Sequence, residues 1–140
     1  MFRRFAQLPA RDKALLLRAA GYVLLARLAL WMLPYRRTRA LVDTLSRGRP
    51  HRTLTPPART AWAVEATAAR IPQASCLTQA LAAEVMLRRQ GHAPDLHIGI
   101  AKDRQAFEAH AWLELDGTVL VGDHDLGRYT RLTPDILDEP

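Results

Sequence analysis

Three residues of this chain have the types and the order of a cysteine nucleophile, its base and the group that orients the base. The single cysteine, Cys76, opens the segment CLTQALAAEVMLRRQ, whose apolar spacing predicts a helix. His110 follows on a segment with the two-residue alternation of a strand, and Asp123 comes directly after the next such segment. A thiolate attacks a carbonyl carbon, an imidazole moves the proton, and a carboxylate fixes the imidazole. These residue types therefore point to acyl chemistry at Cys76.

The position of Cys76 at the start of a helix suits this chemistry. A helix N-terminus and a nearby imidazolium both favour the thiolate form of a cysteine. First-turn amides have no partner inside the helix, so the Cys76 N–H can donate to the oxyanion formed by the attack. Ser75 is the predicted cap of this helix, and Gln79, one turn later, is a further candidate for an oxyanion or substrate contact.

A hairpin count brings the histidine and the aspartate together. The dipeptide 116–117, Asp-Gly, predicts a two-residue turn. Counting outward from that turn, residue by residue, places His110 directly opposite Asp123 on the same face of the sheet. The carboxylate would then fix the tautomer of the imidazole. A one-residue bulge would move Asp123 to the other face and leave Asp125 or Asp116 as candidates.

The remaining pattern predicts the elements that position these residues. Helical periodicity covers residues 14–33, 38–46, 58–71 and 76–90, with Thr55 as the expected capping residue of the third helix. Strands are expected at 96–101, 107–115 and 118–122, and Trp112, on the face of His110, is a candidate substrate contact. We expect an α+β fold in which the cysteine helix packs on a small antiparallel sheet. A basic helical segment, residues 1–52, is expected to pack on a core formed by residues 53–140.

Composition limits the classes of function. The chain has 140 residues, of which 49% are apolar, and its one cysteine cannot form an internal disulfide. The net charge of +6 comes almost wholly from arginine, because Lys13 and Lys102 are the only lysines. Such a charge suits an acidic peptide, a nucleic acid or an anionic membrane, and it also suits a protein from a GC-rich bacterium. The histidines show no metal-ligand spacing, so no metal or cofactor is expected: His51, His92, His97, His110 and His124.

The apolar stretch ALLLRAAGYVLLARLALWML is long enough to cross a bilayer. Arg18 and Arg27 interrupt it, and nine residues at roughly 100° each place them on opposite sides of a helix. One polar face of the helix could therefore not shield both arginines from lipid. No small-residue cleavage site follows, which argues against a signal peptide. We expect a helix packed on the domain or on a partner, with shallow membrane association as the second interpretation.

The chain also resembles a known family. The segments SCLTQAL-x5-LRRQG, DLHIGI, FEAHAWLELDGTVLVGD and RYTRL are similar to the transglutaminase-like proteases of lasso peptide biosynthesis, in particular to the stand-alone leader peptidases. The HAW motif and the Cys-Leu helix start are shared with the wider transglutaminase-like superfamily.

This resemblance implies a papain/transglutaminase-like fold, with Cys76 as nucleophile and His110 as base. The implied reaction is hydrolysis of one peptide bond of a ribosomally made precursor, which releases the leader. The implied partners are the leader peptide, a separate leader-recognition protein and the lasso cyclase, without nucleic acid. The length of the chain is expected to leave no room for a leader-binding module of its own. The expected location is the cytoplasm, with membrane association as an addition.

Three other functions fit parts of the sequence. An acyltransferase would use the same residues and replace water by an amine. A basic nucleic-acid-binding module would leave Cys76 as a buried structural residue, although no recognised binding motif is present. A membrane-surface scaffold would depend on the N-terminal helix.

Overall fold

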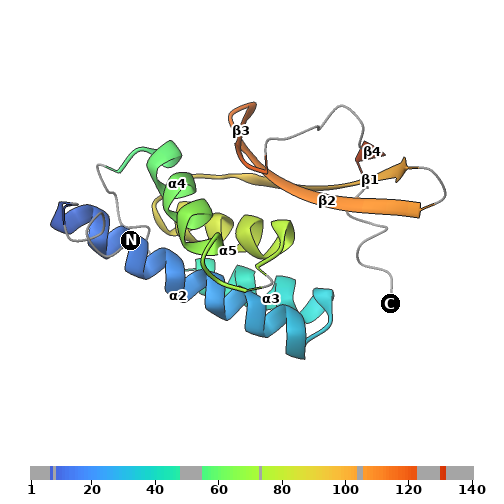
Figure 1. Ribbon diagram of the computed structural model, residues 1–140, viewed down its shortest axis with the longest axis horizontal. Coiled ribbons are helices and arrows are strands. Elements are labelled where there is room, and N and C mark those ends of the chain that lie inside the picture. The colour runs from blue at the N-terminus through green and yellow to red at the C-terminus, as the bar shows by residue number, and fades with distance from the viewer. Residues whose placement is uncertain are drawn as a thin grey trace.

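The computed structural model describes residue 7 and residues 9–47, 55–72, 74–103, 106–122 and 130–131. Within these ranges the helices precede the strands along the chain (Figure 1). The helices are α2 (Ala10–Met32), α3 (Tyr35–Ser46), α4 (Pro57–Ala68) and α5 (Cys76–Arg89). The strands are β1 (Asp95–Asp103), β2 (Ala106–Leu115), β3 (Thr118–Val121) and β4 (Thr130–Arg131). The predicted α+β class is confirmed, and β4 is an element that the sequence pattern did not indicate.

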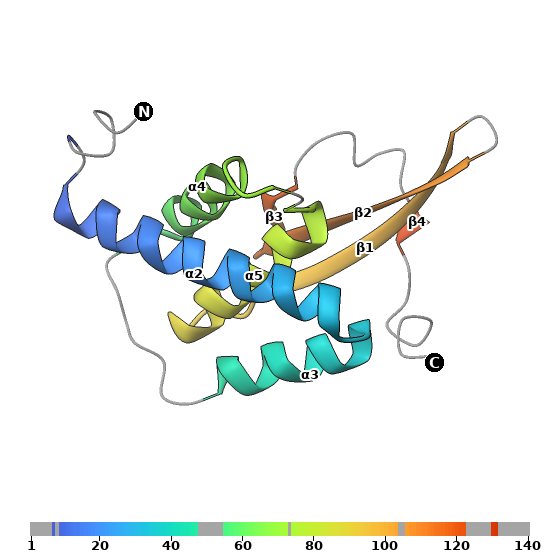
Figure 2. The same ribbon diagram turned by 60° about the horizontal axis from the view of Figure 1, so that its bottom comes forward.

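The sheet has the strand order β3-β2-β1-β4, and each neighbouring pair is antiparallel. The described helices lie on one side of it, with α5 packed against β2 (Figure 1). The long helix α2 packs on α4 and α5, and α3 runs beside α2 (Figure 2). The cysteine helix therefore lies between the sheet and the N-terminal helices.

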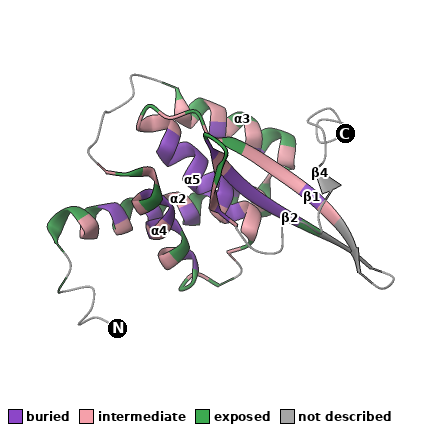
Figure 3. Cartoon of the chain, turned by 90° about the horizontal axis from the view of Figure 1, so that it is seen from above, coloured by how far each residue is buried: buried purple, intermediate pink, exposed green. Residues whose placement is uncertain are grey.

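One apolar core joins the helices to the sheet. Its fully buried side chains include Val23 of α2, Val64 of α4, Leu81 and Leu87 of α5, and Leu113 of β2. Buried residues line α5 along almost its whole length (Figure 3). The N-terminal helices share this core, so the predicted division of the chain at residue 52 stays a prediction.

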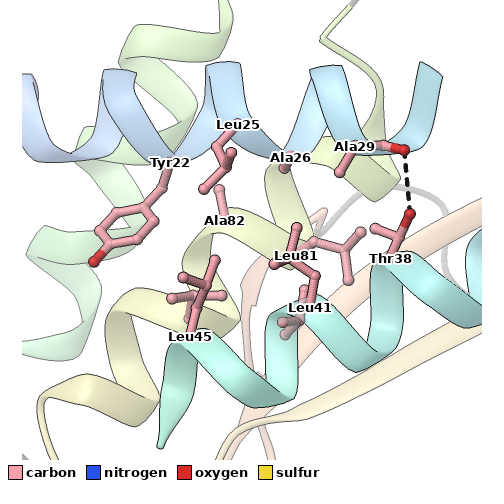
Figure 4. Close-up of a pocket in the computed structure, with 11 residues that line it drawn as sticks. Tyr22, Leu25, Ala26, Ala29, Thr38, Leu41, Leu45, Leu81 and Ala82 are labelled. Carbon is pink, nitrogen blue, oxygen red and sulfur yellow. Dashed lines mark hydrogen bonds between the residues drawn. The ribbon is translucent and has the colours of Figure 1, made fainter. Parts of the chain in front are cut away.

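A small apolar void separates α2, α3 and α5 (Figure 4). Its volume is about 20 Å³, and its walls include Tyr22, Leu41 and Leu81. Thr38 closes one end by donating its hydroxyl hydrogen to the carbonyl oxygen of Ala29, with an O–O distance of 3.3 Å. A space of this size holds at most one water molecule, so it belongs to the packing of the helices and is not a binding site.

The start of α4 differs from the prediction. Pro56 is the N-cap residue, and no side chain caps the helix, so the role predicted for Thr55 is wrong. The reason is local: Pro56 occupies the cap position, and its hydrocarbon ring has no oxygen that could accept a hydrogen bond from the first-turn amides.

A buried carboxylate ties α3 to α5. Glu84 is 1% exposed, and its oxygens lie 2.7 Å from both terminal nitrogens of Arg39. Arg88 reaches both Glu84, at 3.5 Å, and Asp43, at 2.7 Å. Burial lowers the pKa of Arg39, but the hydrogen bond and the charge of Glu84 outweigh it and raise that pKa above its ordinary value.

Replacing Glu84 by alanine is expected to lower the free energy of unfolding by about 2–3 kcal/mol, because two guanidinium groups lose their buried partner. Arg39 and Arg88 remain about one-third exposed, which keeps the loss below that of a fully buried pair. Asp43→Asn is the matched control, since Asp43 is 43% exposed and its loss should cost less than about 1 kcal/mol. Equal losses in the two variants, measured by urea denaturation, would contradict this assignment.

Candidate active site

Helix α5 begins at Cys76, as predicted, and Ser75 caps it. The Ser75 hydroxyl oxygen accepts a hydrogen bond from the Thr78 N–H at 3.2 Å and lies 3.0 Å from the Thr78 hydroxyl. The first-turn amides, that of Cys76 among them, have no partner within the helix. The cap therefore fixes the position of the cysteine, and it holds the helix end that would face an oxyanion.

Replacing Ser75 by alanine should cost about 1 kcal/mol of stability, because the Thr78 amide loses its acceptor. The same change should slow alkylation of the adjacent Cys76, whereas Ser75→Asn should restore both properties. Ser46→Ala is the control, because the Ser46 hydroxyl bonds back to the Val42 carbonyl within its own helix. A Ser75→Ala protein as stable as the wild type would exclude the capping role.

The sulfur of Cys76 lies against strand β2. It accepts a hydrogen bond from the backbone N–H of Ala111 at 3.4 Å, and the thiol is free and half-buried. Ala111 directly follows His110, so the fold brings the cysteine to the strand position that carries the predicted base. Sequence reasoning missed the Ala111 amide, since a backbone donor leaves no signal in residue type.

His110 is 4% exposed, and its Nε2 lies 2.7 Å from the carbonyl oxygen of Gly122. A carbonyl oxygen only accepts, so Nε2 carries the proton and donates it. In the neutral imidazole the other nitrogen, Nδ1, is then the basic one. The Trp112 ring stacks near the imidazole, with ring centroids 6.0 Å apart, and helps to hold its orientation.

The hairpin register differs from the predicted one. The turn at 116–117 is present, and the first two pairs, 115 with 118 and 114 with 119, are as counted. Leu113 then pairs with Val121, because a β-bulge adds one residue to β3. The predicted pairing of Leu113 with Leu120 is wrong, and the count that set His110 opposite Asp123 is shifted by one residue.

Of the three candidate aspartates, only Asp116 lies within the described residues. Asp123 and Asp125 lie outside the described residues. Asp116 is exposed in the turn, six residues from His110 along an extended strand, or roughly 20 Å. Asp116 is therefore no partner of the imidazole, and the carbonyl of Gly122 is the group that the structure places there.

Gly122 must be a glycine at this place. Its φ of +83° lies in the left-handed region. A Cβ atom there would stand 2.7 Å from the carbonyl oxygen of Ala111 and 3.1 Å from the Cβ of Trp112. Because glycine tolerates this positive φ and has no Cβ atom, the chain can pass close to β2 here. This close approach brings the Gly122 carbonyl to the imidazole.

The cysteine opens onto a cleft of about 500 Å³, within the range of small-ligand sites. Its described lining comes from α4, α5 and β3 and consists of Glu65, Cys76, Gln79 and residues 119–122. Gln79 thus lies where a substrate would, although its side-chain amide also donates to the Ala74 carbonyl at 3.4 Å. Glu65 was missed by the sequence reasoning, since only helix packing brings it beside Cys76.

The other side chains on the face of His110 contact one another. Trp112 is 2% exposed and donates its indole N–H to Glu114 at 3.1 Å. It does not belong to the described cleft lining, so its predicted substrate contact stays a prediction. His97 lies near Trp112 and Glu114. Among the described residues no group of three His, Cys, Asp or Glu side chains could hold a metal ion.

A family model described as the transglutaminase-like superfamily matches residues 20–134, which include Cys76, His110 and every described strand. The chain belongs to the transglutaminase-like superfamily. Neither the comparison with curated proteins nor the comparison with solved structures gave a match. The predicted transglutaminase-like fold is thereby confirmed. Membership is compatible with both a cysteine peptidase and an acyltransferase.

Proposed function

We propose that this transglutaminase-like domain is a cysteine peptidase that releases the leader from a ribosomally made lasso precursor peptide. The observation that carries the proposal is the arrangement around Cys76. The thiol stands at a capped helix start, in contact with the amide that follows His110, and it opens onto a cleft. The specific substrate follows from the resemblance of the segments around Cys76 and His110 to leader peptidases.

The first half of the reaction forms a thioester. His110 takes the thiol proton at Nδ1, and the sulfur adds to the scissile carbonyl carbon. The oxyanion forms beside the helix start, where the Cys76 N–H donates to it. His110 then gives its proton to the leaving nitrogen as the C–N bond breaks. While the ring is positively charged, its Nε2–H bond to the Gly122 carbonyl stabilises it.

The second half of the reaction hydrolyses the thioester and regenerates the free enzyme. Water attacks the thioester carbonyl, and His110 takes one of the water protons. The C–S bond breaks, the leader leaves as a carboxylic acid, and the thiolate regains its proton from the imidazolium. Cys76, His110 and water suffice for every step, and the new amino group of the core peptide becomes the substrate of a separate cyclase.

Leader release tests this proposal directly. We incubate the wild-type protein with a candidate precursor and a leader-recognition protein. The masses of the product peptides are then measured by mass spectrometry. We expect two peptides whose masses add up to that of the precursor plus one water. An uncleaved precursor in the presence of the recognition protein would contradict the proposed substrate.

Asp123 enters as the proposed third member of the site, because it directly follows the residue whose carbonyl holds His110. The β-bulge shifts the count that paired Asp123 with His110, so Asp125 is the alternative third member. Replacing Asp123 by asparagine is expected to lower kcat/KM by about 10- to 100-fold, because the ring keeps its bond to Gly122 but loses a charge. Asp116→Asn is the control, since Asp116 lies in the exposed turn. Equal kcat/KM values in the two variants would remove Asp123 from the site and leave the Gly122 carbonyl as the orienting group.

Acyl transfer to an amine is the second candidate, and Glu65 favours it. Glu65 lines the same cleft as Cys76, and a carboxylate there would suit the ammonium group of an amine acceptor. A primary amine added to the cleavage reaction would then appear in the product mass in place of water. A Glu65-dependent amine adduct would support acyltransfer, and water alone in the product would support hydrolysis.

A further inference from the structure

The large exposed apolar side chains of the described residues all lie on one helix. Those on α2 with the greatest exposed fractions are Trp31 at 79%, Leu17 at 66% and Met32 at 65%, followed by Leu24 at 54% and Leu28 at 46%. The opposite side of the same helix is buried in the core. We call the stripe formed by Leu17, Leu24, Leu28 and Trp31 the outer face of α2.

The outer face is continuous. At roughly 100° per residue, Leu17, Leu24 and Trp31 lie within about 40° of one another, and Leu28 lies close beside them. Gly21, on the same side, is exposed, and a Cβ atom there would meet nothing within 4 Å. Helix α2 runs along the outside of the molecule, with α4 and α5 between it and the sheet (Figures 1 and 2). No described segment covers this stripe.

Cations frame the outer face. Arg18 and Arg27 lie on opposite sides of the helix and hence along its two long edges. Exposed arginines also stand near both ends, Arg11 before the stripe and Arg36 and Arg37 after it. The one acidic residue of α2, Asp12, is held by Arg59 at 2.9 Å. An apolar stripe with a rim of guanidinium groups is complementary to an anionic, apolar surface.

The charges argue against two other arrangements. A second copy of the chain on this stripe would bring two arginine rims together, which is repulsive. By length and composition alone α2 could cross a membrane. Crossing would bury Arg18 and Arg27 in lipid and would strip Ala19, Val23 and their buried neighbours from the core.

We propose that the outer face of α2 docks this domain flat on the surface of an anionic phospholipid bilayer. The leucines and Trp31 enter the boundary between head groups and acyl chains, while the exposed side chains of Arg11, Arg18, Arg36 and Arg37 extend to the lipid phosphates. The cleft at Cys76 is formed by α4, α5 and β3 rather than by α2, so docking leaves it accessible. This inference concerns where the domain acts and does not depend on which peptide it cleaves.

Co-sedimentation with vesicles tests the proposal. The wild-type protein is expected to bind vesicles containing phosphatidylglycerol, and to bind vesicles of phosphatidylcholine alone at least about tenfold more weakly. Added salt should weaken the binding to the anionic vesicles. The double variant Leu24→Glu, Leu28→Glu should reduce binding by at least about tenfold. Ala58→Glu with Arg47→Gln changes the net charge equally at exposed positions outside the stripe, and should bind nearly as the wild type does.

Circular dichroism and thermal melting of the variants show that the fold is retained, which is expected because the altered side chains are exposed. Trp31 supplies a local signal: the difference in fluorescence between wild type and Trp31→Phe should shift to the blue when vesicles are added. Absence of wild-type binding to anionic vesicles would overturn the proposal, as would unchanged binding by the leucine double variant. If light scattering showed a wild-type dimer that the leucine double variant does not form, the face would be assigned to a second copy. If the leader-recognition protein bound this face and vesicles did not displace it, the face would be assigned to that protein.

Discussion

Cleavage should stop when Cys76 is replaced by alanine, with a loss of at least about three orders of magnitude in kcat/KM. Alanine has no thiol to form the thioester, so only uncatalysed hydrolysis remains. The fold should persist, because alanine suits a first-turn helical position and the thiol contributes only a weak hydrogen bond with the Ala111 amide. Leader release followed by mass spectrometry, with circular dichroism of the same sample, measures both properties.

His110→Ala should produce a loss of similar size. The double variant with Cys76→Ala should be no worse than either single variant, since in the proposed mechanism the two residues act as a unit. His97→Ala is the control, because His97 lies on the neighbouring strand and contacts Trp112 and Glu114. It should keep a kcat/KM near that of the wild type. Cleavage that survives Cys76→Ala would end the assignment of this residue as the nucleophile.

Gly122→Ala should lower both stability and activity. The new Cβ atom would stand 2.7 Å from the Ala111 carbonyl oxygen, so the chain after β3 must move away from β2. This displacement and the positive φ should together cost about 2–3 kcal/mol of unfolding free energy. The movement also takes the Gly122 carbonyl from Nε2 of His110, and a shift of about 1 Å in a catalytic group lowers kcat/KM by about a hundredfold.

Gly117→Ala is the matched control for this change. Gly117 has nearly the same φ, +81°, but a Cβ atom there would meet nothing within 4 Å. Its replacement should cost only the conformational strain, about 1 kcal/mol, and should leave kcat/KM unchanged. If Gly122→Ala behaved like Gly117→Ala in both measurements, the close approach of Gly122 to β2 would not be what positions the imidazole.

The parts of the site that were predictable from sequence depend on local signals. A serine before an apolar helical period marks the start of α5, and Asp-Gly marks the turn after β2. The β-bulge left no such mark, because residues 118–121 read TVLV and give no alternation by which a one-residue shift would show.

Tertiary contacts explain the rest of what was missed. The Ala111 amide and the Gly122 carbonyl act through backbone atoms, which any residue type provides. Glu65 reaches the cleft only because α4 packs beside α5 and β3. The apolar period of α2 predicted a packed helix, and one face is indeed buried, but only the structure shows how much of the other face stays exposed.

Alkylation of Cys76 by iodoacetamide tests the central claim most directly, because it needs no substrate. The modified cysteine is quantified by peptide mass spectrometry near neutral pH, in the wild type, in His110→Ala and in His97→Ala. The pairing of Cys76 with His110 predicts rapid alkylation of the wild type and of His97→Ala, and at least about tenfold slower alkylation of His110→Ala. Equal rates in all three proteins, or a thiol that stays inert in the folded wild type, would contradict the pairing of Cys76 with His110.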